Sequence, residues 1–217
     1  LRHQVIGRDT TIQTPFGERP LLYFDHTASG RSLTSIETTI ARDVLPHYAN
    51  THLEASHTGR HTGQLREWAR QTIKDVINAG PDDALIFCGS GATGAVNTLV
   101  HLLGLKPGNT QLTDAPDEEP SRALVLIGPY EHHSNELTWR ESLAETVTIP
   151  LSDNGGIDLA ALSSALADPR HAGKRKIGAF SAASNVTGVK TDVIALARCL
   201  HAHGALLCLD CAASAPY

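Results

Sequence analysis

The pattern of apolar and polar positions predicts helices and strands that alternate over most of the chain. Residues 62–77 place apolar side chains three and four positions apart, which is typical of an amphipathic helix, and Gly80 and Pro81 follow. Beyond them, short apolar runs typical of strands alternate with helical spacing. The expected strands are 84–88, 123–128, 146–151, 176–184 and 205–210, and the expected helices are 92–105, 134–144, 158–168 and 191–204.

The N-terminal part is less regular. Residues 1–20 are polar with scattered Gly and Pro, so we expect an arm, followed by a short strand at 21–24. Helical spacing over 32–48 predicts a helix that ends near Pro46. The polar, His-rich segment 49–63 is expected to be a loop.

Strands that alternate with helices require crossover connections, which predict an α/β fold: a mostly parallel sheet with helices on both faces. In such sheets, ligands bind beyond the carboxyl ends of the strands. Four polar segments follow the expected strands and should meet at that rim: 89–93, 131–134, 184–188 and Asp210. The sequence thus predicts one composite site.

Composition and charge exclude several classes of partner and cellular location. With 217 residues and 41% apolar content, we expect one large domain, with or without a partial second. The net charge of −5 and the 5% aromatic content argue against nucleic acid as a partner. No apolar stretch is long enough to span a membrane and no secretory signal is visible, so we expect a cytoplasmic protein with free thiols. Because it begins at Leu1 and contains no Met, the chain is expected to be processed or part of a longer one.

The glycine-rich loop at 89–94 is a candidate phosphate site. Backbone N–H groups at the start of a helix attract anions, although the same glycines could serve a tight turn that requires positive φ. Gly89, Gly91 and Gly94 also match the G-x-G-x-x-G pattern of dinucleotide-binding proteins. That pattern normally lies in the first strand–helix unit with an acid about 20 residues on; here Asp114, in an acidic segment, is the nearest such acid. A phosphate is favoured over a bare turn, and a dinucleotide is disfavoured.

Asp210 ends an apolar strand, where a carboxylate needs a positive partner or a local hydrogen bond. A protonated pyridine nitrogen is such a partner, as in proteins that hold pyridoxal phosphate. The alternative is an Asp that caps the following loop through its own backbone.

Two further rim residues have more than one interpretation. One ring of His132 and His133 could stack on a flat cofactor, or both could lie in solvent. Asn185 could bind a ring oxygen or close an Asx turn. No metal site is expected, because His57 and His61 lie in an expected loop without helical spacing and the single C-x-x-C of 208–211 has no partner pair.

Taken together, these segments resemble the class V aminotransferase group of fold-type I pyridoxal-phosphate enzymes, particularly its cysteine desulfurase and selenocysteine lyase-like members. The resemblance runs from about Tyr23 to Tyr217 and rests on YFDHTASG, GSGATGAVN, EHHSNELTW, SNVTGV and LDCAASAPY, in the family's order. It implies an incomplete large domain of this fold over residues 61–217, preceded by an arm and small-domain segment over 1–60.

The resemblance also implies roles for the rim residues. Gly91, Ala92 and Thr93 match the segment that binds the cofactor phosphate, and His132 matches the residue that stacks on the ring. Asn185 matches the amide near the phenolic oxygen, and Asp210 matches the partner of the pyridinium nitrogen. By this resemblance His132 and Asp210 are the catalytic candidates, pyridoxal 5'-phosphate is the cofactor, and an amino acid is the substrate of a homodimer.

Two departures from the family pattern qualify the expected activity. Ala213 stands where many members carry a Gln, which weakens an assignment to true desulfurases. Only seven residues follow Asp210, so the family's Schiff-base lysine is missing, and this segment alone should be inactive. The alternatives left open are an NAD-dependent oxidoreductase and a non-catalytic, degenerate family member.

Overall fold

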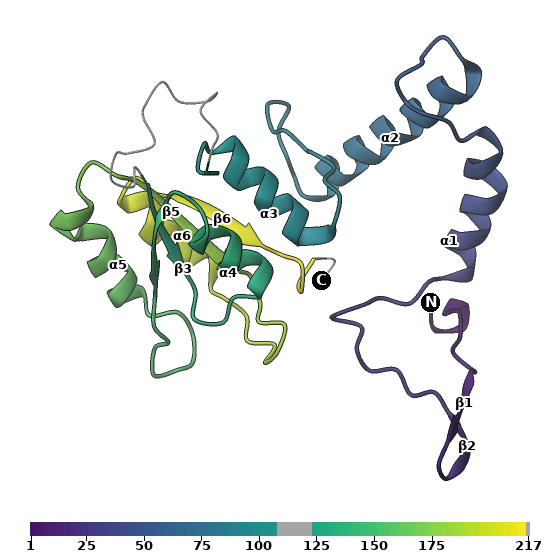
Figure 1. The fold of residues 1–217 in the computed structure, drawn as a ribbon, viewed down its shortest axis with the longest axis horizontal. Coiled ribbons are helices and arrows are strands. Elements are labelled where there is room, and N and C mark those ends of the chain that lie inside the picture. The colour runs from purple at the N-terminus through teal and green to yellow at the C-terminus, as the bar shows by residue number, and fades with distance from the viewer. Residues whose placement is uncertain (108–122, 216–217) are drawn as a thin grey trace. The chain divides into compact units, whose positions relative to one another are not determined.

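The computed structural model describes residues 1–107 and 123–215 of the chain, which divides into two compact units, Leu1–Phe87 and Cys88–Tyr217 (Figure 1). Each unit is described by itself. This division falls later than residue 60, where the resemblance implies the boundary between the small-domain segment and the large domain. That functional boundary stays a prediction.

A four-stranded parallel sheet forms the centre of the second unit. Its strands are β3 (Ala123–Ile127), β4 (Glu145–Thr148), β5 (Arg175–Ser181) and β6 (Leu206–Asp210). They lie in the order β4-β3-β5-β6, and all three pairings are parallel. The predicted α/β fold with a parallel sheet is confirmed.

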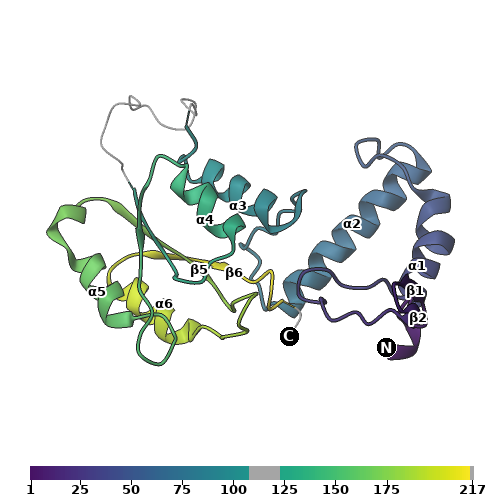
Figure 2. The same ribbon diagram turned by 60° about the horizontal axis from the view of Figure 1, so that its bottom comes forward.

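Helices cover both faces of this sheet, as Figure 2 shows. Helices α3 (Gly91–Leu102) and α4 (His133–Arg140) lie on one face, and α5 (Leu159–Ala167) and α6 (Val193–Ala202) lie on the other. A short 3₁₀ turn, η4 (Pro169–His171), precedes β5. The predicted layering is therefore correct for this unit.

Alternation along β3 explains the two layers. Val125 and Ile127 pack with α3 and α4 in one core cluster, whereas Leu124 and Leu126 pack with α5 and α6 in the other. All five residues of β3 are buried because successive side chains point to opposite faces and both faces are covered. This is why β3 has a continuous apolar sequence.

The first unit is built from short elements and one long helix. It contains η1 (Arg2–Gln4), the antiparallel hairpin of β1 (Thr11–Thr14) and β2 (Gly17–Pro20), α1 (Thr34–Thr39), the π-helical η2 (Ile40–Val44), η3 (Leu45–His47) and α2 (His57–Val76). In the part of the chain that the structure describes, no helix combines the length and apolarity needed to cross a membrane.

Three local predictions in the first unit are wrong. Helix α2 begins at His57, inside the expected loop 49–63, because Ser56 Oγ accepts the Gly59 N–H at 3.0 Å and caps its first turn. Residues 21–24 are not a strand, and residues 1–20 contain the β1–β2 hairpin where we expected an arm.

Residues 84–88 were also expected to form a strand, and they do not. The parallel sheet described here does not include them. A strand is defined by pairing with a neighbour, which a short apolar run alone does not specify. The strand–loop–helix context of the dinucleotide pattern is therefore not formed.

The turn into α3 confirms that its glycines serve a tight conformation. Ser90 and Gly91 both have a left-handed backbone, with φ of 62° and 64°. A Cβ at Gly94 would overlap the carbonyl oxygen of Gly89, so the chain folds back on itself too closely for any side chain there. Gly91 is needed for its φ, and Gly94 for its lack of a side chain.

Gly94→Ala should therefore lower the free energy of unfolding by about 1–3 kcal/mol, the usual range for a forced steric overlap. Chemical denaturation followed by circular dichroism measures the change. Gly63→Ala is the control, because nothing lies within 4 Å of a Cβ at this position in α2. It should raise stability by about 0.5–1 kcal/mol through helix propensity. Equal effects of the two substitutions would contradict the steric explanation.

Candidate functional site

Parallel pairing brings three of the predicted rim segments to one edge of the sheet. Ser181 and Asp210 are the last residues of β5 and β6 and lie opposite each other, and the Ala182 N–H donates to the Asp210 carbonyl at 2.8 Å. Glu131 and His132 follow the neighbouring strand β3 at the same edge. The candidate site is at this edge.

A pocket of about 390 Å³ lies between the start of α3 and the end of β6. Its lining residues are Ala92, Ala95, Val96, Leu99, Asn135, Cys208, Leu209, Asp210, Cys211, Ala212 and Ala215. Ala92 in the first turn of α3 and Asp210 at the end of β6 thus border one cavity. Its volume is within the roughly 300–1,000 Å³ typical of small-ligand sites.

The first turn of α3 keeps backbone donors available to an anion. Ser90 occupies the N-cap position but, among the described residues, its side chain makes no capping hydrogen bond. The first N–H groups of any helix have no partner within the helix, and the helix dipole makes this end positive. Gly91, Ala92 and the exposed Thr93 form this turn. The arrangement fits a phosphate.

Asp210 caps the turn that follows it, as its alternative interpretation predicts, and it also borders the pocket. Its Oδ1 accepts the Ala212 N–H at 2.9 Å, which caps the following turn. The side chain is half-buried and is a lining residue of the pocket. The capping bond fixes the orientation of the carboxylate, so the two roles are compatible.

His132 is the N-cap residue of α4. Its Nδ1 accepts the Ser134 N–H at 3.2 Å and lies 2.7 Å from Ser134 Oγ. An accepting Nδ1 places the proton of the neutral ring on Nε2. The rings of His132 and His133 are both exposed, with centroids 6.1 Å apart and planes tilted by 47°. The stacking role of His132 stays a prediction.

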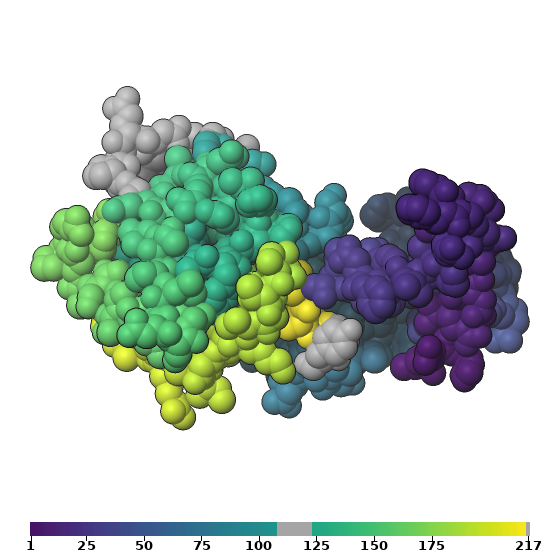
Figure 3. All heavy atoms as spheres, turned by 90° about the horizontal axis from the view of Figure 1, so that it is seen from below, coloured from purple at the N-terminus to yellow at the C-terminus, as the bar shows by residue number. Residues whose placement is uncertain are grey.

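Asn185 lies in an exposed turn after β5, where the segment 185–190 forms part of the surface seen in Figure 3. Ser184 holds this turn, because its Oγ accepts the N–H groups of Val186 at 3.3 Å and Thr187 at 3.2 Å. Among the described residues, the lining of the pocket includes neither Asn185 nor Gly91, Thr93 and His132.

Sequence reasoning placed Glu131 at the rim but gave it no role, and it missed Asn135. The Glu131 carboxylate accepts three hydrogen bonds: from Ser181 N at 2.9 Å, Ser181 Oγ at 2.6 Å and Asn135 Nδ2 at 2.7 Å. Burial raises the pKa of this carboxyl, the hydrogen bonds from Ser181 and Asn135 oppose the shift, and the charge of Asp210 adds to it. An acidic residue shortly after a fully buried strand is the sequence signal that could have drawn attention to Glu131.

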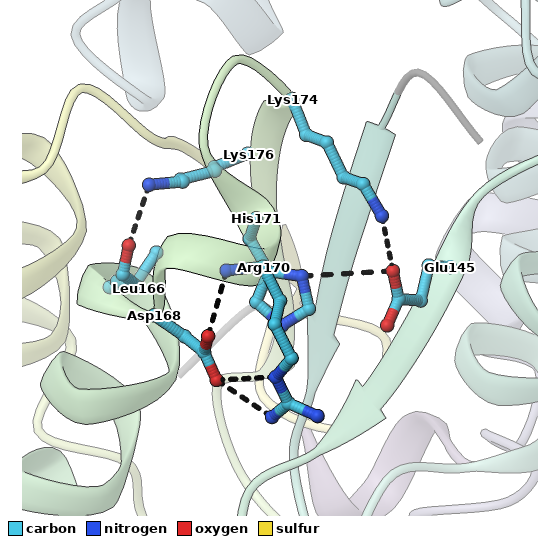
Figure 4. Close-up of polar contacts among 7 residues, drawn as sticks. All are labelled: Glu145, Leu166, Asp168, Arg170, His171, Lys174 and Lys176. Carbon is cyan, nitrogen blue, oxygen red and sulfur yellow. Dashed lines mark hydrogen bonds and ion pairs between the residues drawn. The ribbon is translucent and has the colours of Figure 1, made fainter. Parts of the chain in front are cut away.

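A separate group of charged residues lies at the opposite edge of the sheet, where β4 and β5 begin (Figure 4). Lys174 Nζ binds the Glu145 carboxylate, which lowers the pKa of that carboxyl, and Lys176 Nζ donates to the Leu166 carbonyl at 2.6 Å. Asp168 Oδ2 accepts from Arg170 at 2.7 Å. Both lysines are thus engaged away from the pocket.

Across the residues that the structure describes, no group of three or more His, Cys, Asp or Glu side chains could hold a metal ion. His57 and His61 lie one turn apart on α2 with ring centroids 6.4 Å apart. Cys208 and Cys211 are free thiols, and burial raises the pKa of Cys208.

Several curated relatives of the chain are described as cysteine desulfurases or probable cysteine desulfurases. A protein from Halalkalibacterium halodurans described as a probable cysteine desulfurase is 30% identical over 91% of this chain and 46% of its own length. A protein with the same description from Vibrio cholerae is 30% identical over 92% of this chain and 46% of its own. The chain spans about half the length of these relatives.

Solved structures agree on the fold. The cysteine desulfurase of Thermococcus onnurineus matches with a TM-score of 0.68 at 22% identity, over 88% of this chain and 44% of that one. One from Escherichia coli matches with a TM-score of 0.61 at 25% identity, over 87% and 44%. The fold is thus that of the fold-type I pyridoxal-phosphate enzymes.

The sequence model described as "Aminotransferase class-V" matches residues 22–217. The chain therefore belongs to the class-V aminotransferase family.

Proposed function

We propose that the chain is part of an enzyme that uses pyridoxal 5'-phosphate to act at the amino group of an amino acid, as cysteine desulfurases do. One observation carries this proposal: the uncapped first turn of α3 and the Asp210 carboxylate border the same pocket. Pyridoxal 5'-phosphate carries a phosphate group and a ring nitrogen that can be cationic. A protein that binds it needs a site for each of these two groups. The lining and volume of the pocket support this proposal, because the volume suits a small ligand.

The residues present fit the cofactor. Backbone N–H groups of Gly91, Ala92 and Thr93 would hold the phosphate, and Asp210 would accept a hydrogen bond from the ring nitrogen. The bound cofactor would withdraw electron density from the carbon next to the substrate's amino group. Asp210 supports this chemistry by keeping the ring nitrogen protonated.

His132 and Asn185 complete the proposed site. The His132 ring would pack on one face of the cofactor ring, held in place by its bonds to Ser134 at the start of α4. The amide of Asn185 would bind the phenolic oxygen. The proposal also includes a catalytic lysine from a part of the protein outside these 217 residues. It further includes a homodimer and a cytoplasmic location.

Of the two rival functions, the structure disfavours the first. An NAD-dependent oxidoreductase would need a strand before its glycine loop, and residues 84–88 do not form one. A degenerate, non-catalytic family member would retain the fold and the pocket. Finding a lysine of the proposed kind in the full-length protein would distinguish an enzyme from that alternative.

Asp210→Asn should weaken binding of pyridoxal 5'-phosphate about 10- to 100-fold, because a charge-assisted hydrogen bond contributes about 1.5–3 kcal/mol. Absorbance titration of the wild type and the variant measures both dissociation constants. The amide is of equal size and can still accept the Ala212 N–H at Oδ1. Asp153→Asn, an exposed residue outside the pocket, is the control and should bind like the wild type. Equal affinity of the Asp210 variant would refute the assigned role.

Pyridoxal, which lacks the phosphate, should bind at least about tenfold more weakly than pyridoxal 5'-phosphate, because it forfeits the hydrogen bonds to the first turn of α3. Inorganic phosphate should compete with the phosphorylated compound in the same titration. Saturable binding of NAD, together with no response to pyridoxal 5'-phosphate, would favour the oxidoreductase instead.

A further inference from the structure

Glu131 connects the elements that carry the proposed site residues. It follows β3, yet two of its three hydrogen bonds are to Ser181 at the end of β5, and the third is to Asn135 in the first turn of α4. One carboxylate thus joins segments separated by 50 residues of sequence. Satisfying a partly buried carboxylate with three donors also fixes those donors in space.

The contact with Ser181 bears on Asp210. Ser181 is the register partner of Asp210 in the parallel pair β5–β6, and the N–H of Ala182, the residue that follows β5, donates to the Asp210 carbonyl at 2.8 Å. The position of the Ser181 backbone therefore determines where the end of β6 lies. Through this pairing, Glu131 holds the strand end from which Asp210 enters the pocket.

The contact with Asn135 bears on His132 and on the pocket itself. The Asn135 N–H donates to the His132 carbonyl at 2.8 Å, and Asn135 Oδ1 accepts the indole N–H of the fully buried Trp139 at 3.1 Å. Asn135 is also a lining residue of the pocket. The Glu131–Asn135 bond thus fixes the start of α4, which His132 caps.

Gly128 provides the space that this carboxylate occupies. A Cβ at Gly128 would overlap Glu131 Oε1 and would lie 3.2 Å from Phe180 Cδ1. Gly128 borders the Glu131 carboxylate, so a substitution at Gly128 displaces this carboxylate without changing any charge.

We propose that Glu131 is a positioning residue, whose bonds to Ser181 and Asn135 set the relative placement of Asp210 and His132 for one ligand. This inference rests on the proposed binding of pyridoxal 5'-phosphate. Glu131 does not line the pocket and acts through its two partners.

Glu131→Gln tests the proposal, because Gln keeps the size but replaces one accepting oxygen by a donor facing Ser181 or Asn135. Wild type and variant are titrated with pyridoxal 5'-phosphate at a temperature at which thermal unfolding curves show both to be folded. We expect the dissociation constant to rise at least about fivefold. The absorption spectrum of the bound ligand should also shift, because the ring nitrogen no longer meets Asp210 in the same geometry.

Gly128→Ala should weaken binding in the same direction, since it moves the carboxylate while retaining its charge. Glu136→Gln is the matched control: Glu136 lies on α4, next to Asn135, and its carboxylate binds Arg140 at 2.7 Å, away from the pocket lining. It should leave both the affinity and the spectrum unchanged.

The outcomes separate the two proposals. If the wild type fails to bind pyridoxal 5'-phosphate, the proposed function is overturned, and this inference with it. If the wild type binds and folded Glu131→Gln has the same affinity within twofold and the same spectrum, only the positioning role is overturned. A lowered melting temperature with unchanged binding would likewise show that Glu131 is merely structural.

Discussion

The parallel pairing of β3, β5 and β6 is the constraint on which the rest of the second unit depends. Parallel strands end at one edge, so every segment that leaves a strand there is brought next to its neighbours without any direct sequence proximity. The register that sets Ser181 opposite Asp210 fixes, to within one residue, where the chain leaves β5 and β6. Because β3 is buried on both faces, a one-residue slip in its register would exchange the side chains that pack in the two core clusters.

Much of this unit could be predicted because its signals are local and redundant. The run Ala123–Ile127 is apolar throughout, and only a strand covered on both faces buries all five residues. The same reasoning fails for residues 84–88, since a short apolar run does not state whether a partner strand is present. In the first unit, the N-cap Ser56 is a start signal for α2 that the His-rich composition of the segment obscured.

In the candidate site, too, local sequence patterns identify single residues but not the contacts between distant ones. Gly91 and Asp210 stand at boundaries between elements, where sequence patterns mark them out. The importance of Glu131 lies in its bonds to Ser181, 50 residues away, and a linear pattern does not contain that contact. Asn185 matches a family position by resemblance. The side chain that closes its turn is that of the neighbouring Ser184, and sequence spacing could not distinguish this turn from an Asx turn closed by Asn185.

The left-handed Ser90 at the start of α3 has a thermodynamic consequence. A residue other than glycine in this conformation is strained, and a helix start without a side-chain cap lacks about 1 kcal/mol that Ser, Thr or Asp usually contributes there. An anion seated on those N–H groups would restore that contribution. Ligand binding and local order at this helix terminus would then be coupled, because an anion bound there would also complete the hydrogen bonding of the first turn of α3.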